Sequence, residues 1–215
     1  MRLIAKGAEA ELWRTDYLGR PALVKRRVPK KYRNSALDAR IRRLRTKEEC
    51  LLLHRAKECG VRAPLIYNVD RAGTEIVMEF VDGEKLRDVM RKKGKNKKNV
   101  FGFCSEVGRN VAKLHRGGLV HGDLTTSNII VPNQKPKKTA KAGLVFVDFG
   151  LGFMSSRTED FAVDLLVFKK TFSATHWELM PKGWEAIMQG YARGNPKGRE
   201  IERKVEAVEG RVRYH

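Results

Sequence analysis

Short apolar runs separated by turn residues dominate the first part of the chain. Two strand-like runs, at 12–17 and 22–25, flank the turn sequence Leu18-Gly19-Arg20-Pro21 and predict a β-hairpin. From Ser35 to Cys59 apolar residues recur at the intervals of a helix. Ser35 is a candidate N-cap of this helix, and Gly60 is placed to end it.

Two more strands, at 65–69 and 75–81, follow the predicted helix, and after Gly83 the pattern becomes mainly helical. The predicted helices cover 84–92, 100–116, 158–172, 184–191 and 198–208, and β-segments interrupt them at 128–131 and 144–147. This order predicts an α+β fold, a single domain built of two lobes. Residues 1–82 form a small β-rich lobe with one long helix, and residues 83–215 form a mainly helical lobe.

The composition is that of a globular protein, because 41% of the 215 residues are hydrophobic and can bury a core. The apolar runs are too short to cross a bilayer, so no membrane partner is expected. Cys50, Cys59 and Cys104 show no Cys-x-x-Cys spacing and are typical of reduced cytosolic thiols. A cytoplasmic location is therefore expected.

The charge is strongly basic, with 45 Lys and Arg against 25 Asp and Glu and a net charge of +20. Such a chain is expected to bind polyanions, whether nucleic acid, nucleotide phosphates or an acidic membrane surface. The segment Lys25–Lys47 contains eleven basic residues and one acid, Asp38. Two further clusters, at 91–98 and 135–141, are rich in Gly, Pro and Asn and are predicted to lie in loops.

The sharpest chemical motif is His121-Gly122-Asp123-Leu124-Thr125-Thr126-Ser127-Asn128, followed twenty residues later by Asp148-Phe149-Gly150. Phosphoryl transfer needs a carboxylate at the attacking group, together with an amide and a second carboxylate that hold Mg²⁺ against the phosphates. Asp123, Asn128 and Asp148 fit these three roles. The β-segments around them are expected to bring the three side chains together.

The N-terminal lobe should then supply a phosphate-binding lysine. Lys25 follows the apolar run Ala22-Leu23-Val24, as such a lysine does. Its ammonium group needs a carboxylate from the following helix, and Glu48 and Glu49 are the acids in the middle of that helix. Helical periodicity alone does not choose between these two glutamates.

A phosphate-covering loop is expected before the lysine, at Lys6-Gly7-Ala8-Glu9-Ala10. This segment has one glycine, so it offers fewer freely oriented backbone N–H groups than a glycine-rich loop does. Glu79, after the apolar run Ile76-Val77-Met78, stands where an adenine-binding hinge is expected.

Together these residues resemble the protein-kinase-like superfamily and, more narrowly, the small atypical kinases of the KEOPS complex. Four stretches of the sequence carry the resemblance: residues 6–10; residues 25–33 with 37–38 and 45–46; residues 121–128; and residues 159–165 with 175–176. It implies a reduced bilobal kinase fold that binds ATP and Mg²⁺. It also implies serine/threonine phosphorylation, including autophosphorylation, and ATPase activity in support of threonylcarbamoyladenosine modification of tRNA.

The resemblance also implies partners and site residues. The partners are the threonylcarbamoyl-transferase subunit and a further small subunit of the complex, with tRNA contacting the basic surface directly or through the complex. Glu49 matches the ion-pairing glutamate better than Glu48 does, and the catalytic residues would be Asp123, Lys25 and Glu49. The metal ligands would be Asn128 and Asp148. The nucleotide contacts would be Ile4, Lys6, Gly7, Ala8, Glu9, Ala10, Lys25, Glu79, Asn128 and Asp148.

The chain departs from ordinary protein kinases at several positions. Gly122 replaces the arginine that clamps a phosphorylated activation loop, and Thr125 replaces a phosphate-contacting lysine. No Ala-Pro-Glu follows Gly150. Two alternatives therefore stay open: a small-molecule phosphotransferase of the same superfamily, and a non-catalytic basic scaffold that binds tRNA.

Overall fold

The computed structural model describes residues 1–70, 72, 74–93, 97–133 and 143–212. The basic cluster at 135–141 and residues 94–96 lie outside the described residues, so the loops predicted there stay predictions. The rest of the cluster at 91–98 is helical, since residues 91–93 end helix α2 (Leu86–Lys93) and residues 97–98 begin helix α3 (Lys97–Arg116). The loop prediction is wrong there, because Lys and Arg are good helix formers.

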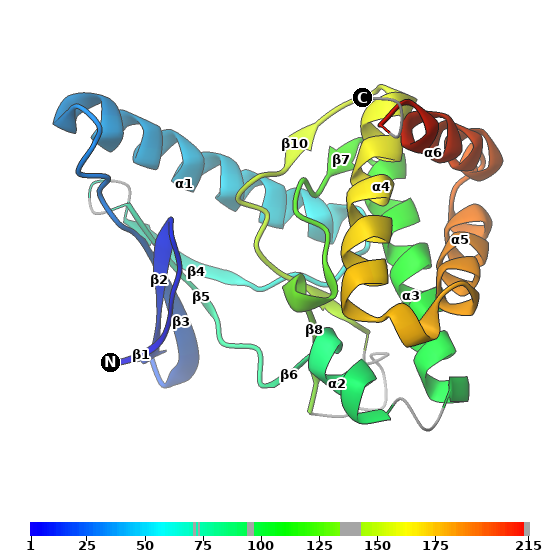
Figure 1. The fold of residues 1–215 in the computed structure, drawn as a ribbon. Helices are drawn as coiled ribbons and strands as arrows, with labels where there is room; N and C mark the ends of the chain where they lie inside the picture. Colours follow the sequence, from blue (N-terminus) through cyan, green and yellow to red (C-terminus); the bar gives the residue numbers. More distant parts are fainter. Residues whose placement is uncertain (71, 73, 94–96, 134–142, 213–215) are drawn as a thin grey trace.

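The N-terminal lobe is a five-stranded antiparallel sheet with one long helix beside it (Figure 1). The strand order in the sheet is β1-β2-β3-β5-β4. The strands are β1 (Arg2–Lys6), β2 (Ala10–Tyr17), β3 (Arg20–Arg27), β4 (Ile66–Asp70) and β5 (Glu75–Glu79). The predicted hairpin is the β2–β3 pair, in which Leu12 lies opposite Lys25. β3 is therefore a central strand, and Lys25 has a neighbouring strand on each side.

Helix α1 (Ser35–Glu58) links the two lobes. Its C-terminal half contributes Leu52, Leu53 and Ala56 to the main hydrophobic core, which otherwise consists largely of residues from the C-terminal lobe. The N-cap is Asn34 and not Ser35 as predicted, because the Asn34 side chain accepts hydrogen bonds from the N–H groups of Ala36 and Leu37 at 3.0 and 3.3 Å. Either side chain is a favourable cap, so the sequence alone does not fix the first residue of the helix.

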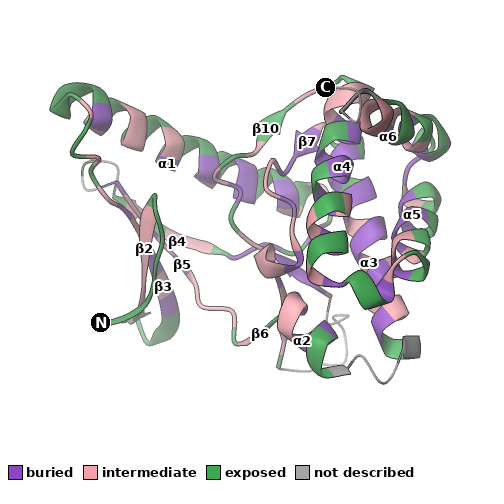
Figure 2. Ribbon diagram, viewed as in Figure 1, coloured by how far each residue is buried: buried purple, intermediate pink, exposed green. Residues whose placement is uncertain are grey.

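The C-terminal lobe is mainly helical, and its helices turn buried faces toward one another (Figure 2). The helices are α2 (Leu86–Lys93), α3 (Lys97–Arg116), α4 (Thr158–Thr175), α5 (Lys182–Gly194) and α6 (Gly198–Val212), with short 3-10 helices η1 (Thr126–Asn128) and η2 (Trp177–Leu179). Two small antiparallel sheets complete the lobe: β6 (Gly83–Lys85) with β8 (Ile129–Pro132) and β9 (Val145–Phe146), and β7 (Leu119–Val120) with β10 (Phe153–Met154).

The predicted α+β architecture is confirmed, and the predicted helices and strands occur in the predicted order, but the short strands β6, β7 and β10 were not predicted. Strand β1 was not predicted, because all five of its residues are exposed and show no apolar alternation. We propose to keep the lobe boundary between residues 82 and 83, since β6 begins at Gly83 and pairs with β8. Among the described residues, no helix combines the length and apolar character that crossing a membrane requires.

Candidate active site

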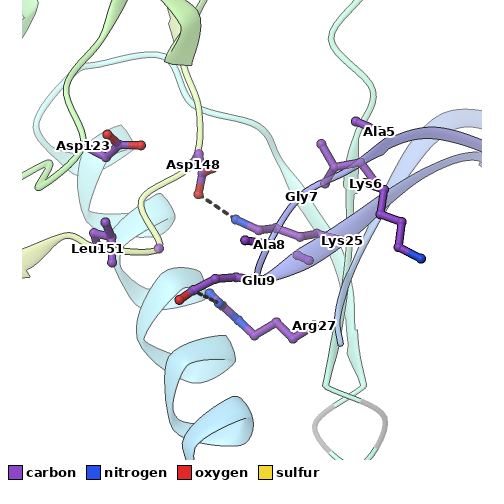
Figure 3. Close-up of a pocket in the computed structure, with 13 residues that line it drawn as sticks. Ala5, Lys6, Gly7, Ala8, Glu9, Lys25, Arg27, Asp123, Asp148 and Leu151 are labelled. Atoms are coloured by element: carbon purple, nitrogen blue, oxygen red, sulfur yellow. Dashed lines mark hydrogen bonds and ion pairs between the residues drawn. The ribbon is translucent and has the colours of Figure 1, made fainter. Parts of the chain in front are cut away.

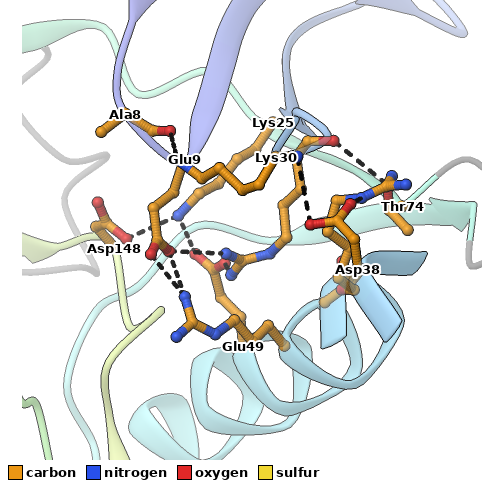
Figure 4. A network of polar contacts seen from close by, with 12 residues as sticks. Ala8, Glu9, Lys25, Lys30, Asp38, Glu49, Thr74 and Asp148 are labelled. Carbon is orange, nitrogen blue, oxygen red and sulfur yellow. Dashed lines mark hydrogen bonds and ion pairs between the residues drawn. The ribbon is translucent and has the colours of Figure 1, made fainter. Parts of the chain in front are cut away.

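An ion-pair triad joins the two lobes at one point; Figure 3 draws its Lys25–Asp148 contact, and Figure 4 labels all three residues. The ammonium of Lys25, on β3, donates to Glu49 Oε1 of α1 at 2.5 Å and to Asp148 Oδ1, after β9, at 2.7 Å. Glu49 is 1% exposed, whereas Glu48 is exposed to solvent. The choice between these two glutamates that periodicity left open is thus decided by burial, and Glu49 is the partner of Lys25.

The charges of the triad support one another. Burial alone would lower the pKa of Lys25, but the carboxylates of Glu49 and Asp148 outweigh burial and hold its pKa above the usual value. Burial would likewise raise the pKa of Asp148, but the Lys25 ammonium keeps it below the usual value. Both groups are therefore ionised at neutral pH.

A second buried cation, Arg27, lies two residues beyond Lys25 on the same face of β3 (Figure 3). Its Nη2 donates to Glu49 Oε2 at 2.5 Å, so each oxygen of the Glu49 carboxylate binds a different cation. Sequence reasoning placed Arg27 in the basic segment and in the stretch 25–33 that carries the resemblance, but gave it no role of its own at the site. The signal that could have found it is the Lys-x-Arg spacing on a central strand.

The loop motif holds Asp123 and Asn128 together. The side-chain amide nitrogen of Asn128 donates to both the backbone oxygen and the carboxylate of Asp123, each at 2.9 Å. Thr125, which stands in place of a lysine, caps η1 by accepting a hydrogen bond from Ser127 N–H at 3.2 Å. Thr125 therefore has a structural role in shaping the turn that carries Asn128.

A buried acid, Asp164 of α4, holds the backbone of the 121–128 loop in place. Its carboxylate accepts hydrogen bonds from the N–H groups of His121 and Gly122 at 3.1 and 2.9 Å, and it contacts His115 Nε2 at 3.1 Å. Burial would raise the pKa of Asp164, but the hydrogen bond with His115 and the nearby histidines lower it. Sequence reasoning assigned no role to Asp164, although an acid inside the apolar run Phe161–Leu166 was a usable signal.

Gly122 is required by its position. Its φ is +78°, and a Cβ atom there would lie 2.1 Å from the backbone oxygen of Leu151. The residue that replaces the kinase arginine is thus a glycine on which the segment after Asp148-Phe149-Gly150 packs directly. Phe149 is fully buried against His121, with ring centroids 4.5 Å apart.

His176 supports the same loop from the C-terminal end of α4. It is buried, and its Nε2 lies 2.9 Å from the hydroxyl of Thr126. Burial, together with the nearby guanidinium groups of Arg91 and Arg87, lowers the pKa of His176 to about 4. The ring is therefore neutral at physiological pH, and we assign it a structural role.

Two adjoining cavities meet at Lys25, and both include Leu12 and Asp148 in their walls. The first, of about 460 Å³, is lined by the predicted loop residues Lys6, Gly7, Ala8, Glu9 and Ala10, together with Asp123. The second, of about 380 Å³, has a more apolar wall that includes the predicted residues Ile4, Glu79 and Asn128. The predicted site residues thus gather around one continuous cleft, with an ionic end and an apolar end.

The donor set fits Mg²⁺ bound through a phosphorylated ligand. The described residues contain no cluster of three or more His, Cys, Asp or Glu side chains able to hold a metal ion by themselves. Asp148 is half exposed, and Asn128 uses its amide nitrogen toward Asp123, which turns its amide oxygen the other way. One carboxylate and one amide oxygen suit Mg²⁺, which commonly takes its other ligands from water and substrate phosphates.

The fold and this arrangement of lysine, glutamate and loop acids define a kinase-like protein. Residues 22–140, more than half of the chain, match the family model RIO1, which is described as the RIO domain. The chain is 39% identical, over its full length and 96% of the relative, to the KEOPS complex subunit Bud32 of Pyrococcus abyssi. The chain therefore belongs to the RIO-domain family of atypical kinases that includes Bud32.

A longer relative carries a similar segment within a larger protein. The probable bifunctional tRNA threonylcarbamoyladenosine biosynthesis protein of Methanothermobacter thermautotrophicus is 38% identical over 99% of the chain, which covers 36% of that protein. The chain thus spans about a third of the length of this relative.

Solved structures show the same fold at low sequence identity. WaaP in complex with acyl carrier protein has a TM-score of 0.66 at 19% identity, covering 96% of this chain and 88% of WaaP. The Rio2 kinase–ADP/Mg²⁺–phosphoaspartate complex from Chaetomium thermophilum has a TM-score of 0.57 at 15% identity, covering 100% of this chain and 72% of Rio2.

Proposed function

We propose that the chain binds ATP with Mg²⁺ in the two joined cavities and either transfers the terminal phosphate or releases it to water. The observation that carries this proposal is the Lys25–Glu49–Asp148 triad, with Lys25 and Glu49 buried and Asp148 half exposed at the junction of the cavities. An ammonium held between two carboxylates is oriented toward the ionic cavity, where a phosphate chain would replace Asp148 as its partner.

The other site residues take roles in the same proposal. Ile4 and Glu79 would contact the adenine end of the nucleotide, and the loop of Lys6, Gly7, Ala8, Glu9 and Ala10 would cover its phosphates. Asn128 and Asp148 would hold Mg²⁺, which supplies charge neutralisation at the phosphates. Asp123 would orient the attacking hydroxyl or water, and Asn128 keeps the Asp123 carboxylate in place through its 2.9 Å hydrogen bond.

We infer that the acceptor is a serine or threonine of a protein held in a complex, of the chain itself, or water. The segment between Gly150 and α4 is short: β10 pairs at once with β7, and α4 begins at Thr158. Such a segment leaves little surface to dock a free peptide. It favours ATP hydrolysis, or phosphorylation of a partner that other contacts hold, including autophosphorylation.

The names of the relatives support a place in the KEOPS complex and in threonylcarbamoyladenosine modification of tRNA. We propose that the partners are the threonylcarbamoyl-transferase subunit and a further small subunit. A cytoplasmic location goes with this proposal. Direct contact with tRNA is favoured by the exposed cations Arg40, Arg43 and Lys47 on α1.

The direct test is ATP turnover in Lys25→Ala and Asp148→Ala variants, measured as phosphate release with Mg²⁺. Each should lose at least about a hundredfold in turnover, because each removes a group that contacts the phosphates or the metal. Lys31→Ala, an exposed lysine of the same basic segment, serves as the control. Circular dichroism would verify the fold. If both site variants turn over ATP like the parent chain, the proposal fails.

Two further measurements separate the alternatives. Rapid phosphorylation of aminoglycosides, choline or sugars by the parent chain would favour a small-molecule phosphotransferase. Direct tRNA binding should weaken steeply between 50 and 200 mM salt, roughly 10³-fold or more if six or more phosphates are contacted. Binding that barely changes with salt would contradict direct recognition through the basic surface.

A further inference from the structure

The loop between β1 and β2 carries a carboxylate that is held by two arginines (Figure 4). Both oxygens of Glu9 accept hydrogen bonds from Nη1 of Arg45, on α1, at 2.7 and 2.6 Å. One of these oxygens also lies 3.6 Å from Nη1 of Arg27. The Lys30 ammonium donates to the backbone oxygen of Ala8. The loop is therefore fastened to β3 and α1 by cations, and Glu9 is its charged tip.

Arg27 is a buried arginine whose guanidinium group uses only part of its hydrogen-bonding capacity. Its side chain is 4% exposed, its Nη2 is bound to Glu49, and its buried Nε has no hydrogen-bond partner in the described part of the chain. Arg27 lines the ionic cavity together with Lys25, Asp123 and Asp148. Nε is enclosed, but Nη1 lies 3.6 Å from Glu9, which is longer than a hydrogen bond, so Nη1 can still bind an oxygen of an anion in the cavity that Arg27 lines.

Glu9 stands where such an anion would come. It lines the same cavity as Arg27 and Lys25, and it belongs to the loop that would cover the phosphates. The hydrogen bonds from Arg45, aided by Arg27 and Lys30, lower its pKa, so the carboxylate is ionised at neutral pH. Carboxylates and phosphates take the same bidentate contacts from arginine, so they compete for one guanidinium.

We propose that Arg27 binds the terminal phosphate of a triphosphate. The Glu9 carboxylate competes with this phosphate for the Arg27 guanidinium, and the triphosphate displaces it. This inference rests on the proposed function and adds to it a means of telling triphosphate from diphosphate. A triphosphate reaches Arg27 and displaces Glu9, which keeps Arg45 or turns to solvent. A diphosphate is too short to reach Arg27, so Glu9 stays in place.

If Glu9 instead helps the loop to bind a nucleotide, its removal should weaken nucleotide binding and not strengthen it. If the Glu9–Arg45 contact only holds the loop closed over a nucleotide, removing it would weaken the binding of triphosphate and diphosphate alike. The two roles therefore predict opposite changes in the affinity for MgATP when the Glu9 charge is removed. A binding measurement at equilibrium distinguishes them without measuring turnover.

The experiment is titration calorimetry of the full chain with MgATP and MgADP, for the parent and for Glu9→Gln. The variant should bind MgATP about tenfold more tightly, because it no longer presents a competing charge. Its affinity for MgADP should stay within about twofold of the parent value. Glu48→Gln, an equal change of charge at an exposed position of α1, should leave both affinities unchanged.

A second variant tests Arg27 itself. Arg27→Lys keeps the charge beside Glu49 but removes the guanidinium fork, so affinity for MgATP should fall at least fivefold more than affinity for MgADP. Weaker or unchanged MgATP binding in Glu9→Gln would overturn the inference, and so would equal effects of Arg27→Lys on the two nucleotides. A parent chain that bound neither nucleotide would instead contradict the proposed function, and the inference with it.

Discussion

The carboxylate of Glu49 lies 2.5 Å from the ammonium of Lys25, although 24 residues separate them in the chain. The pair joins the central strand of the sheet to the middle of α1, and Arg27 binds the second Glu49 oxygen at 2.5 Å. One buried carboxylate thus balances two buried cations. Its loss affects both the fold of the N-terminal lobe and the orientation of the lysine.

Replacement of Glu49 by Gln should therefore destabilise the protein. Two buried cations would lose their shared anion, which costs about 3 to 5 kcal/mol in the free energy of unfolding. Glu48→Gln, next to it but exposed, should change stability by no more than about 0.5 kcal/mol. Urea denaturation of the two variants measures the difference, and equal stabilities would contradict the role assigned to Glu49.

Asp164→Asn tests whether the hydrogen bonds that Asp164 accepts from the 121–128 loop hold that loop in place. The amide presents an NH₂ group on one side, so one of the donors now bound by Asp164 loses its acceptor. The expected loss of stability is about 1 to 3 kcal/mol, with a parallel loss of ATP turnover because the Asp123 loop shifts. Glu206→Gln, on the exposed side of α6, is the matched control, and a loss as small as in that variant would show that Asp164 is dispensable.

Gly122 should not tolerate a side chain. In Gly122→Ala the Cβ would meet the Leu151 oxygen at 2.1 Å and the residue would keep a positive φ, so we expect a loss of at least about 2 kcal/mol. Gly102, in an exposed part of α3 with open space around it, gives the comparison. There the change to Ala should stabilise the helix by about 0.5 to 1 kcal/mol. Thermal unfolding of both variants measures these opposite signs.

Stability should fall on mild acidification because of His176. Its pKa is about 4 in the folded protein and about 6.5 when unfolded, so between these values only the unfolded chain takes up the proton. Stability from this group is therefore fully present above pH 6.5 and is lost as the pH falls toward 4. Between pH 7 and 5 the loss amounts to about 2 kcal/mol.

Urea denaturation at pH 7, 6 and 5 measures this loss, and His176→Gln should remove most of it. The Gln side chain can still contact Thr126 but does not titrate. A wild-type slope that persists in the variant would assign the effect to other groups. His121 is the first of these to consider, because burial also lowers its pKa.

The local signals in the sequence were sufficient for the helices, for strands β2 to β5, β8 and β9, and for the loop motif, but not for the short strands β6, β7 and β10. Alternating and helical periodicities located the hairpin, α1 and the helices of the C-terminal lobe, because these patterns follow directly from which faces are buried. Strand β1 was missed for the same reason, since none of its faces is buried. The residue types of Asp123, Asn128 and Asp148 indicated phosphoryl chemistry because few other chemistries use that set in that order.

Relationships across long stretches of the chain were decided only by the tertiary structure. Helical periodicity could not choose Glu49 over Glu48, because that choice depends on which side of α1 turns toward β3. The roles of Arg27, Glu9 and Asp164 also depend on the tertiary structure, since each of these side chains bonds to residues of another element. Sequence determined which chemical groups this protein has and on which elements they lie. Packing of the two lobes decided which of those groups meet, because ion pairing depends on distance in space and not on distance along the chain.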